Sequence, residues 1–270
     1  MSYRLLVCDI DDTLVRFPDP PSPRTRETIR AARAAGVTVA LATGRAFRRA
    51  RPIAQTLDID TPIICNHGGS IRDARTGEMI HRETMPRTLT RRIVSWLQTQ
   101  HVHILIFDGD LVYHDCKTDE VVPDFQIYTQ GEQSIFCRDV LQVLPERTEI
   151  ILATSRDREY LAHLSERAWA RFHDKVRVLY THPHGLDVMP TSSKSQAVAW
   201  LAAHLDVPPA QVIAVGDGSN DVDMLAWAGL GIAIGDGSPE ALAAADVVAP
   251  PFEQDGLAWA IERYILSVTT

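Results

Sequence analysis

The sequence contains few cysteines, no long apolar run and no concentrated basic segment. Its four cysteines form no CxxC pair and stand far apart: Cys8, Cys65, Cys116 and Cys137. This spacing favours free thiols in a reducing cytoplasm over a disulfide framework. No stretch approaches the roughly 20 apolar residues that span a bilayer, and the N-terminal apolar run reaches acidic residues too soon for a signal peptide. We therefore expect a cytoplasmic globular protein with no membrane partner.

The charge balance is acidic. The chain has 27 basic and 35 acidic side chains, a net charge of −8 at pH 7, and its densest basic run is confined to residues 45–51. Because proteins that bind nucleic acid usually present a basic stripe or patch, nucleic acid is not expected as a partner. A length of 270 residues suits one large domain or two moderate ones. These patterns do not indicate an oligomeric state.

Apolar runs alternate with helical patterns over the first 65 residues. Strands are predicted at 3–10, 37–42 and 62–65, and helices at 22–35 and 47–57. The first helix has Ser22 as a candidate N-cap and Pro23 in its first turn, and the second is expected to bend at Pro52. This β-α-β-α-β order predicts parallel strands joined by right-handed crossovers.

The pattern changes between about residue 70 and Met189. Predicted here are hairpins at 70–83 and 103–115, helices at 89–100 and 157–172, and strands at 149–153 and 176–180. After Met189, helices and apolar strands alternate again, from a helix at 194–204 to a closing helix that ends near Leu266. We therefore predict an α/β protein. Its Rossmann-like parallel-sheet core comprises residues 1–82 and 190–270, and residues 83–189 form an inserted α+β domain.

Two carboxylates follow the first predicted strand. Asp9 and Asp11 are two residues apart, so on an extended segment they point to the same face. Open parallel sheets bind ligands outside the carboxyl ends of their strands. Like charges this close favour a divalent cation or a raised pKa on one of them, and Mg²⁺ prefers carboxylate and carbonyl oxygens. An isolated DxD is more often a polar loop that caps a strand, but the strand before Asp9 favours a ligand site.

Three further segments stand at comparable positions. The segment GDGSND (216–221) follows a predicted strand at 212–215, and Thr43 with Gly44 follows the strand at 37–42. Lys194 begins a predicted helix, from which it could place a positive charge near a phosphate. Each segment alone is as often, or more often, an ordinary turn, helix cap or surface lysine. Dinucleotide-binding, Walker A and nucleophile-elbow motifs are all missing.

Taken together, four motifs resemble those of the haloacid dehalogenase superfamily of phosphatases, in the same order and spacing. They are DIDDTL from Asp9, ATGR from Ala42, Lys194, and GDGSNDVDML from Gly216. The large insert and the ending at 228–262 resemble the Cof-type branch, which has a large α+β cap, so the resemblance covers nearly the whole chain. The chain departs from the usual pattern at Asp12 (usually glycine), Ser195 (commonly glycine) and Asp236 (commonly asparagine), and its loop NHGGS from Asn66 is one residue longer.

The resemblance implies a Mg²⁺-dependent phosphatase that hydrolyses small phosphorylated metabolites, with sugar phosphates as the expected substrates. Asp9 would be the nucleophile that forms an aspartyl-phosphate, and Asp11 the general acid and base. The remaining implied roles are Mg²⁺ ligation by Asp9, the backbone carbonyl of Asp11, and Asp217; phosphoryl binding by Thr43, Gly44, Lys194 and Asn220; and support from Asp221. The inserted domain would be a mobile cap that selects the leaving group.

Two other functions stay open at this point. A phosphomutase-type phosphotransferase would use the same core but return the phosphoryl group to a sugar instead of water. A non-catalytic module that binds Mg²⁺ or phosphate is less favoured, because both Asp9 and Asp11 are present.

Overall fold

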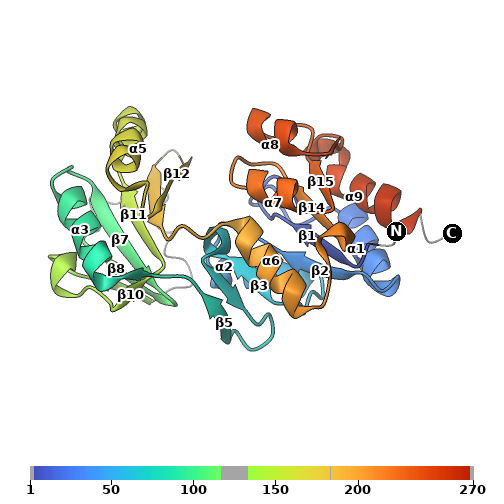
Figure 1. The fold of residues 1–270 in the computed structure, drawn as a ribbon, viewed down its shortest axis with the longest axis horizontal. Helices are drawn as coiled ribbons and strands as arrows, with labels where there is room; N and C mark the ends of the chain where they lie inside the picture. Colours follow the sequence, from blue (N-terminus) through green and yellow to red (C-terminus); the bar gives the residue numbers. More distant parts are fainter. Residues whose placement is uncertain (1–2, 117–132, 183, 268–270) are drawn as a thin grey trace. The chain divides into compact units, whose positions relative to one another are not determined.

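The computed structural model describes residues 3–116, 133–182 and 184–267 (Figure 1). The chain divides into two compact units, each with its own core. The first unit comprises Met1–His81 and Ser193–Thr270, and the second comprises Arg82–Ser192. The first unit is therefore built from both ends of the chain, as the resumed alternation after Met189 suggests.

The first unit is centred on a sheet of five parallel strands in the order β16-β15-β14-β1-β2. Their bounds are β1 Leu5–Cys8, β2 Thr38–Leu41, β14 Val212–Gly216, β15 Leu230–Ala233 and β16 Val247–Val248. The predicted α/β fold with a parallel sheet is confirmed.

Helices cover both faces of this sheet (Figure 1). They are α1 Pro23–Ala34, α2 Phe47–Thr56, α6 Lys194–His204, α7 Val222–Trp227, α8 Pro239–Ala244 and α9 Gly256–Ile261, which continues as η5 Glu262–Leu266. Side chains alternate between the faces of a strand, so Leu6 and Cys8 pack with α1, α2 and α9, whereas Leu5 and Val7 pack with α6, α7 and α8. Burial on both faces explains why β1 is apolar without interruption.

A small antiparallel sheet continues from the edge next to β2. It contains β3 Ile63–Cys65, β4 Ser70–Arg72 and β5 Met79–Arg82, and Ala42 forms a parallel bridge with Ile64 of β3. The predicted hairpin at 70–83 is therefore present as β4 and β5. A single tight turn, η1 Asn66–Gly68, joins β3 to β4. This turn lies at the same sheet edge as the predicted site.

The second unit is an α+β unit, as predicted. Its sheet has six strands in the order β12-β13-β11-β7-β8-β9, and α3 and α5 pack on one face of it. The strands are β7 His103–Asp108, β8 Leu111–His114, β9 Gln133–Phe136, β11 Ile150–Thr154, β12 Arg177–His182 and β13 Gly185–Met189. The remaining elements of this unit are α3 Arg87–Gln98, α5 Arg158–Phe172, the turn η2 Val140–Gln142, and the short pair β6 Met85–Pro86 and β10 Arg147–Thr148. Its action as a cap stays a prediction.

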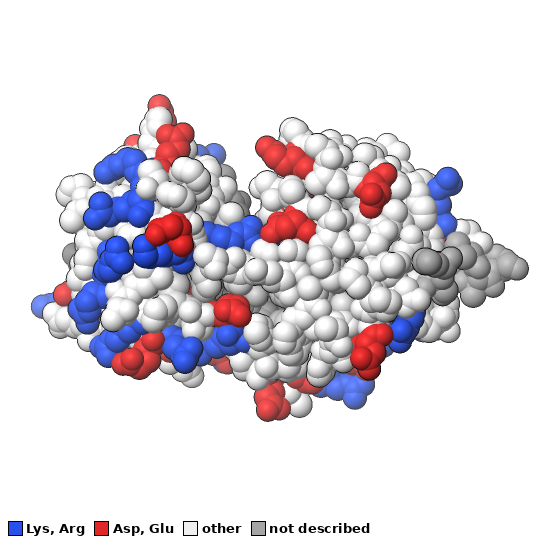
Figure 2. All heavy atoms as spheres, viewed as in Figure 1, with Lys and Arg blue, Asp and Glu red and all other residues white. Residues whose placement is uncertain are grey.

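The surface of the second unit is strongly charged on the face that Figure 2 shows, where Lys and Arg side chains lie among Asp and Glu. The same view of the first unit is mostly uncharged (Figure 2). Among the described residues, no helix combines the length and the apolar character needed to cross a membrane.

Candidate active site

The predicted carboxylates gather at the carboxyl ends of two neighbouring strands. Asp9 directly follows β1, is 4% exposed, and its backbone N–H donates to the carbonyl of Val215 at 2.9 Å. Asp217 directly follows β14, which pairs with β1. With Asp221, these residues offer three carboxylate oxygens that lie within 4.8 Å of one another. The sheet thus brings together residues that are more than 200 positions apart in sequence.

Lys194 lies among these carboxylates. It is the first residue of α6, which Ser193 caps by accepting a hydrogen bond from the backbone of Gln196, and it is fully buried. Its Nζ contacts Oδ1 of Asp9 and donates to Oδ1 of Asp221 at 2.6 Å. Burial acts to lower the pKa of Lys194, but the carboxylates of Asp221 and Asp9 outweigh it and raise that pKa. The lysine is therefore charged.

Asp221 orients the neighbouring loop. While its Oδ1 accepts from Lys194, its Oδ2 accepts from the backbone N–H groups of Asp217 at 3.1 Å and Gly218 at 3.0 Å. A Cβ on Gly216 would lie 2.6 Å from the carboxyl carbon of Asp221, so the loop closes this tightly only with glycine there. Asp221 thus holds both the lysine and the segment that carries Asp217.

The charges in this cluster do not balance. Two buried carboxylates, Asp9 and Asp221, and the half-buried carboxylate of Asp217 share the site with one ammonium group, which leaves a formal charge of −3 + 1 = −2 when all are ionised. Burial, together with Asp221 and Asp217, raises the pKa of Asp9 well above its usual range, although Lys194 opposes this. Burial also raises the pKa of Asp217 to about 7, against a hydrogen bond of 2.7 Å from the Thr13 hydroxyl. This excess of negative charge is what a divalent cation would neutralise.

The predicted phosphoryl-binding residues meet at the end of β2. Thr43 is fully buried, and its hydroxyl accepts from the backbone N–H of Arg45 at 3.1 Å. Gly44 is covered by the ring of His67, because a Cβ on Gly44 would lie 2.3 Å from Cε1 of that ring. The same ring faces Asn220, whose Nδ2 lies 3.3 Å from His67 Nδ1. Thr43, Gly44 and Asn220 therefore converge around a histidine that sequence reasoning missed.

Asp11 lies outside the carboxylate cluster. Its side chain is 50% exposed and pairs with the guanidinium of Arg45, whose Nε donates to Oδ2 at 2.9 Å. Arg45 is itself only 9% exposed, so its guanidinium is held against the site. From the ATGR motif, the sequence predicts roles for the hydroxyl of Thr43 and for a backbone amide. It does not predict that the arginine of this motif pairs with Asp11.

Comparison with known proteins identifies the family. A model of the haloacid dehalogenase-like hydrolases matches residues 6–261. The chain belongs to the haloacid dehalogenase-like hydrolases. Phosphatase YwpJ of Bacillus subtilis is 26% identical and covers 94% of this chain and 97% of its own length, and pyridoxal phosphate phosphatase YbhA of Escherichia coli is 24% identical over 98% of this chain and 100% of its own. The predicted family and enzyme class, a phosphoric monoester hydrolase, are confirmed.

A solved structure agrees with this assignment. A haloacid dehalogenase-like hydrolase from Bacteroides thetaiotaomicron is 28% identical, covers 97% of this chain and 99% of its own, and superposes with a TM-score of 0.84. The endoribonuclease YBEY of Arabidopsis chloroplasts is 27% identical over 97% of this chain, but the chain spans only 46% of that protein's length.

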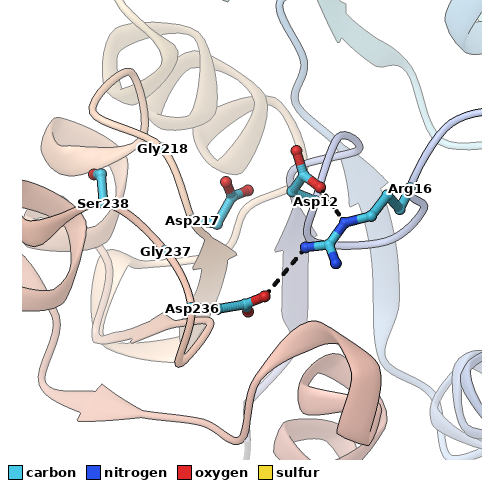
Figure 3. Close-up of a pocket in the computed structure, with 7 residues that line it drawn as sticks. All are labelled: Asp12, Arg16, Asp217, Gly218, Asp236, Gly237 and Ser238. Atoms are coloured by element: carbon cyan, nitrogen blue, oxygen red, sulfur yellow. Dashed lines mark hydrogen bonds and ion pairs between the residues drawn. The ribbon is translucent and has the colours of Figure 1, made fainter.

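Arg16 of this hydrolase links three loops beside Asp217. Its guanidinium donates to Asp12 at 2.6 Å and to Asp236 at 3.1 Å (Figure 3). It also donates to Glu253 at 2.9 Å. By the resemblance, glycine is expected at the position of Asp12 and asparagine at that of Asp236, so each of these acids adds a charge. Arg16 pairs with both new charges, which explains how the hydrolase accommodates them.

The backbone at Asp12 explains why glycine is usual there. Its φ of 57° lies in the left-handed region, which aspartate enters more readily than most side chains do. Arg16 and Asp12 line a cavity of about 330 Å³ together with Asp217 and Gly218 (Figure 3). The departure at Asp12 therefore changes the charge beside the site while the loop keeps a glycine-like conformation.

Proposed function

We propose that this hydrolase is a Mg²⁺-dependent phosphatase of small phosphorylated metabolites, sugar phosphates among them, acting in the cytoplasm through an aspartyl-phosphate on Asp9. The observation that carries the proposal is the buried contact of Lys194 with Asp9, beside Asp217 and next to Thr43 and Gly44. A charged lysine on a buried carboxylate, at a sheet edge that offers a hydroxyl and backbone amides, suits a group that must approach a phosphoryl dianion.

The first half-reaction transfers the phosphoryl group to the protein. An Asp9 carboxylate oxygen attacks phosphorus, and the bond between phosphorus and the ester oxygen breaks. Lys194, Thr43, Gly44 and Asn220 bind the phosphoryl oxygens and stabilise the charge that they carry. Lys194 also acts to lower the pKa of Asp9, against the burial that raises it. The leaving alcohol departs with a proton that Asp11 supplies.

The second half-reaction restores Asp9. Asp11 takes a proton from a water molecule, whose oxygen attacks phosphorus, and inorganic phosphate leaves with the Asp9 carboxylate regenerated. Asp11 lies on the exposed side of the site, where alcohol and water enter, and its pairing with Arg45 has to open for each proton transfer.

The carboxylate cluster fits Mg²⁺ as the cofactor. Oxygens of Asp9 and Asp217 would hold it with the backbone carbonyl of Asp11, whereas the oxygens of Asp221 already accept from Lys194 and the backbone. When bound, Mg²⁺ would neutralise the excess charge of −2 and stabilise negative charge on the phosphoryl oxygens.

Hydrolysis of p-nitrophenyl phosphate tests the proposal. We expect EDTA to abolish turnover, Mg²⁺ to restore it, and Asp9→Asn to eliminate both turnover and acid-stable labelling of the protein by a radioactive phosphoester. Asp12→Asn is the matched control, because Asp12 is in the same loop but 53% exposed and should retain most activity. Turnover that is unchanged in EDTA would contradict the metal, and labelled Asp9→Asn would contradict the nucleophile.

The substrate class needs a second experiment. A phosphate-release screen over phosphorylated sugars, cofactors and nucleotides should show the highest kcat/KM among small phosphoesters. Pyridoxal phosphate belongs in the panel because the name of the E. coli relative includes it. A preference for polymeric substrates such as phosphoproteins would contradict the proposal.

A further inference from the structure

The turn η1 carries an unusual run of backbone conformations. Asn66 and His67 have φ of 52° and 54°, and Gly68 has φ of 96°, so three consecutive residues are left-handed. Two of them have side chains, and such residues rarely adopt this conformation unless the surroundings enforce it. The surroundings of η1 therefore fix the backbone conformation at His67.

The turn is fastened to two parts of the site. The backbone N–H groups of Asn66 and His67 donate to the carbonyls of Arg45 and Thr43, both at 3.0 Å, one on each side of Gly44. On its other side, a Cβ on Gly68 would lie 2.3 Å from the carbonyl oxygen of Ser193, immediately before Lys194. The backbone of η1 is therefore fixed between the segment that follows β2 and the start of α6.

This attachment places the His67 ring between Gly44 and Asn220. The ring is buried, with the residue only 6% exposed, and its Cε1 and Nε2 would lie 2.3 and 2.5 Å from a Cβ on Gly44. The Nδ2 of Asn220 is 3.3 Å from His67 Nδ1. Because an amide nitrogen only donates, Nδ1 accepts this hydrogen bond and the ring proton is on Nε2, beside Gly44.

We infer that His67 is a positioning residue that holds the Asn220 amide and the Thr43–Gly44 backbone in the arrangement that binds phosphoryl oxygens. The inference rests on the proposed function. Asn220 is on a loop at the end of β14 and Gly44 on a loop at the end of β2, and β1 separates these strands in the sheet. The His67 ring contacts both loops. The two loops are therefore already ordered before phosphate binds, and binding does not have to meet the entropic cost of ordering them.

Two substitutions separate the hydrogen bond from the ring. His67→Gly permits the left-handed backbone but removes the acceptor, whereas His67→Asn tolerates that backbone and places Oδ1 where Nδ1 accepts from Asn220. His101→Gly and His101→Asn are matched controls, because His101 is an exposed histidine with φ of 52° in the second unit. Thermal unfolding of each variant checks that it is folded.

The probe is inorganic phosphate, measured by calorimetry in Mg²⁺, with steady-state hydrolysis of p-nitrophenyl phosphate as the second readout. We expect His67→Gly to weaken phosphate binding and to raise KM, each by about tenfold, while kcat changes by less than about threefold. For His67→Asn, the phosphate affinity, KM and kcat should all stay within about threefold of the wild-type values. Asn220→Ala combined with His67→Gly should weaken binding by less than the product of the two single losses, because both changes remove the contact between His67 and Asn220.

Three results from the site variants would each overturn the inference. They are phosphate binding by His67→Gly that equals wild type, failure of His67→Asn to restore it, and losses in the double variant that multiply. Equal losses in the His101 variants would also overturn it, since the effect would not belong to the site. A wild-type protein that binds phosphate but does not hydrolyse phosphoesters would refute the proposed function and leave the inference supported or refuted by the binding data alone.

Discussion

Lys194→Met is the sharpest perturbation of the site. The change keeps most of the volume of a fully buried side chain but removes the ammonium group that contacts Asp9 and Asp221. Three carboxylates then share the site with no positive charge among the side chains that the structure shows in contact with them. Removing one partner of a buried ion pair destabilises a protein by about 3–5 kcal/mol, because the other charge stays buried and unpaired.

The pH dependence of this loss follows from the raised pKa of Asp217. Its pKa is about 7 in the folded protein, and an unfolded aspartate has a pKa of about 3.9. Between these values the folded state binds a proton that the unfolded state has released, so the free energy of unfolding falls as pH rises through this window. Without Lys194 the carboxylates repel one another more strongly, so the loss should be close to its full size at pH 8 and clearly smaller at pH 5.5.

Urea unfolding in EDTA, followed by circular dichroism at both pH values, measures this loss. Lys175→Met is the control, because Lys175 is 44% exposed and should show no comparable loss at either pH. Mg²⁺ should recover part of the lost stability at pH 8, and kcat should fall by about 10²–10³-fold even in saturating Mg²⁺. A Lys194→Met protein as stable as wild type at pH 8 without Mg²⁺ would refute the charge argument.

Three further predictions concern single residues. The apparent Mg²⁺ affinity in activity titrations should rise with pH up to about pH 7, because Mg²⁺ displaces the Asp217 proton. Asp217→Asn should weaken this affinity and make its rise with pH shallower. Asp11→Asn should slow hydrolysis of a sugar phosphate by about 10²–10⁴-fold. Hydrolysis of p-nitrophenyl phosphate should slow much less, because nitrophenolate leaves without a proton. Equal losses with the two substrates would contradict the role of Asp11. Arg16→Ala should lower the free energy of unfolding only slightly, because the ion pairs of Arg16 are exposed, and this loss should vanish in high salt. A large loss that does not depend on salt would contradict this expectation.

The positions of the main carboxylates followed from the sequence. Uninterrupted apolar runs predicted buried parallel strands, and parallel strands end at one sheet edge, so Asp9 and Asp217 were expected to meet there. The structure places them after β1 and β14, which are neighbours. The order of motifs and the change of pattern between residue 70 and Met189 also predicted the family and the insertion in the fold. These features depend on local periodicity, which a single sequence displays.

The partners of individual side chains were decided by the tertiary structure. Lys194 was expected to bind phosphoryl oxygens and to offset the charge on Asp9, but its second carboxylate partner, Asp221, 27 residues away, depends on how α6 packs on the sheet. The contact of His67 with Asn220 joins residues that are 153 positions apart, which no local pattern in the sequence relates. Which atoms touch across such separations depends on rotamers and on a left-handed turn that the packing of the first unit enforces. Periodicity determines which face of an element is buried, whereas only the packed structure determines which polar groups meet there.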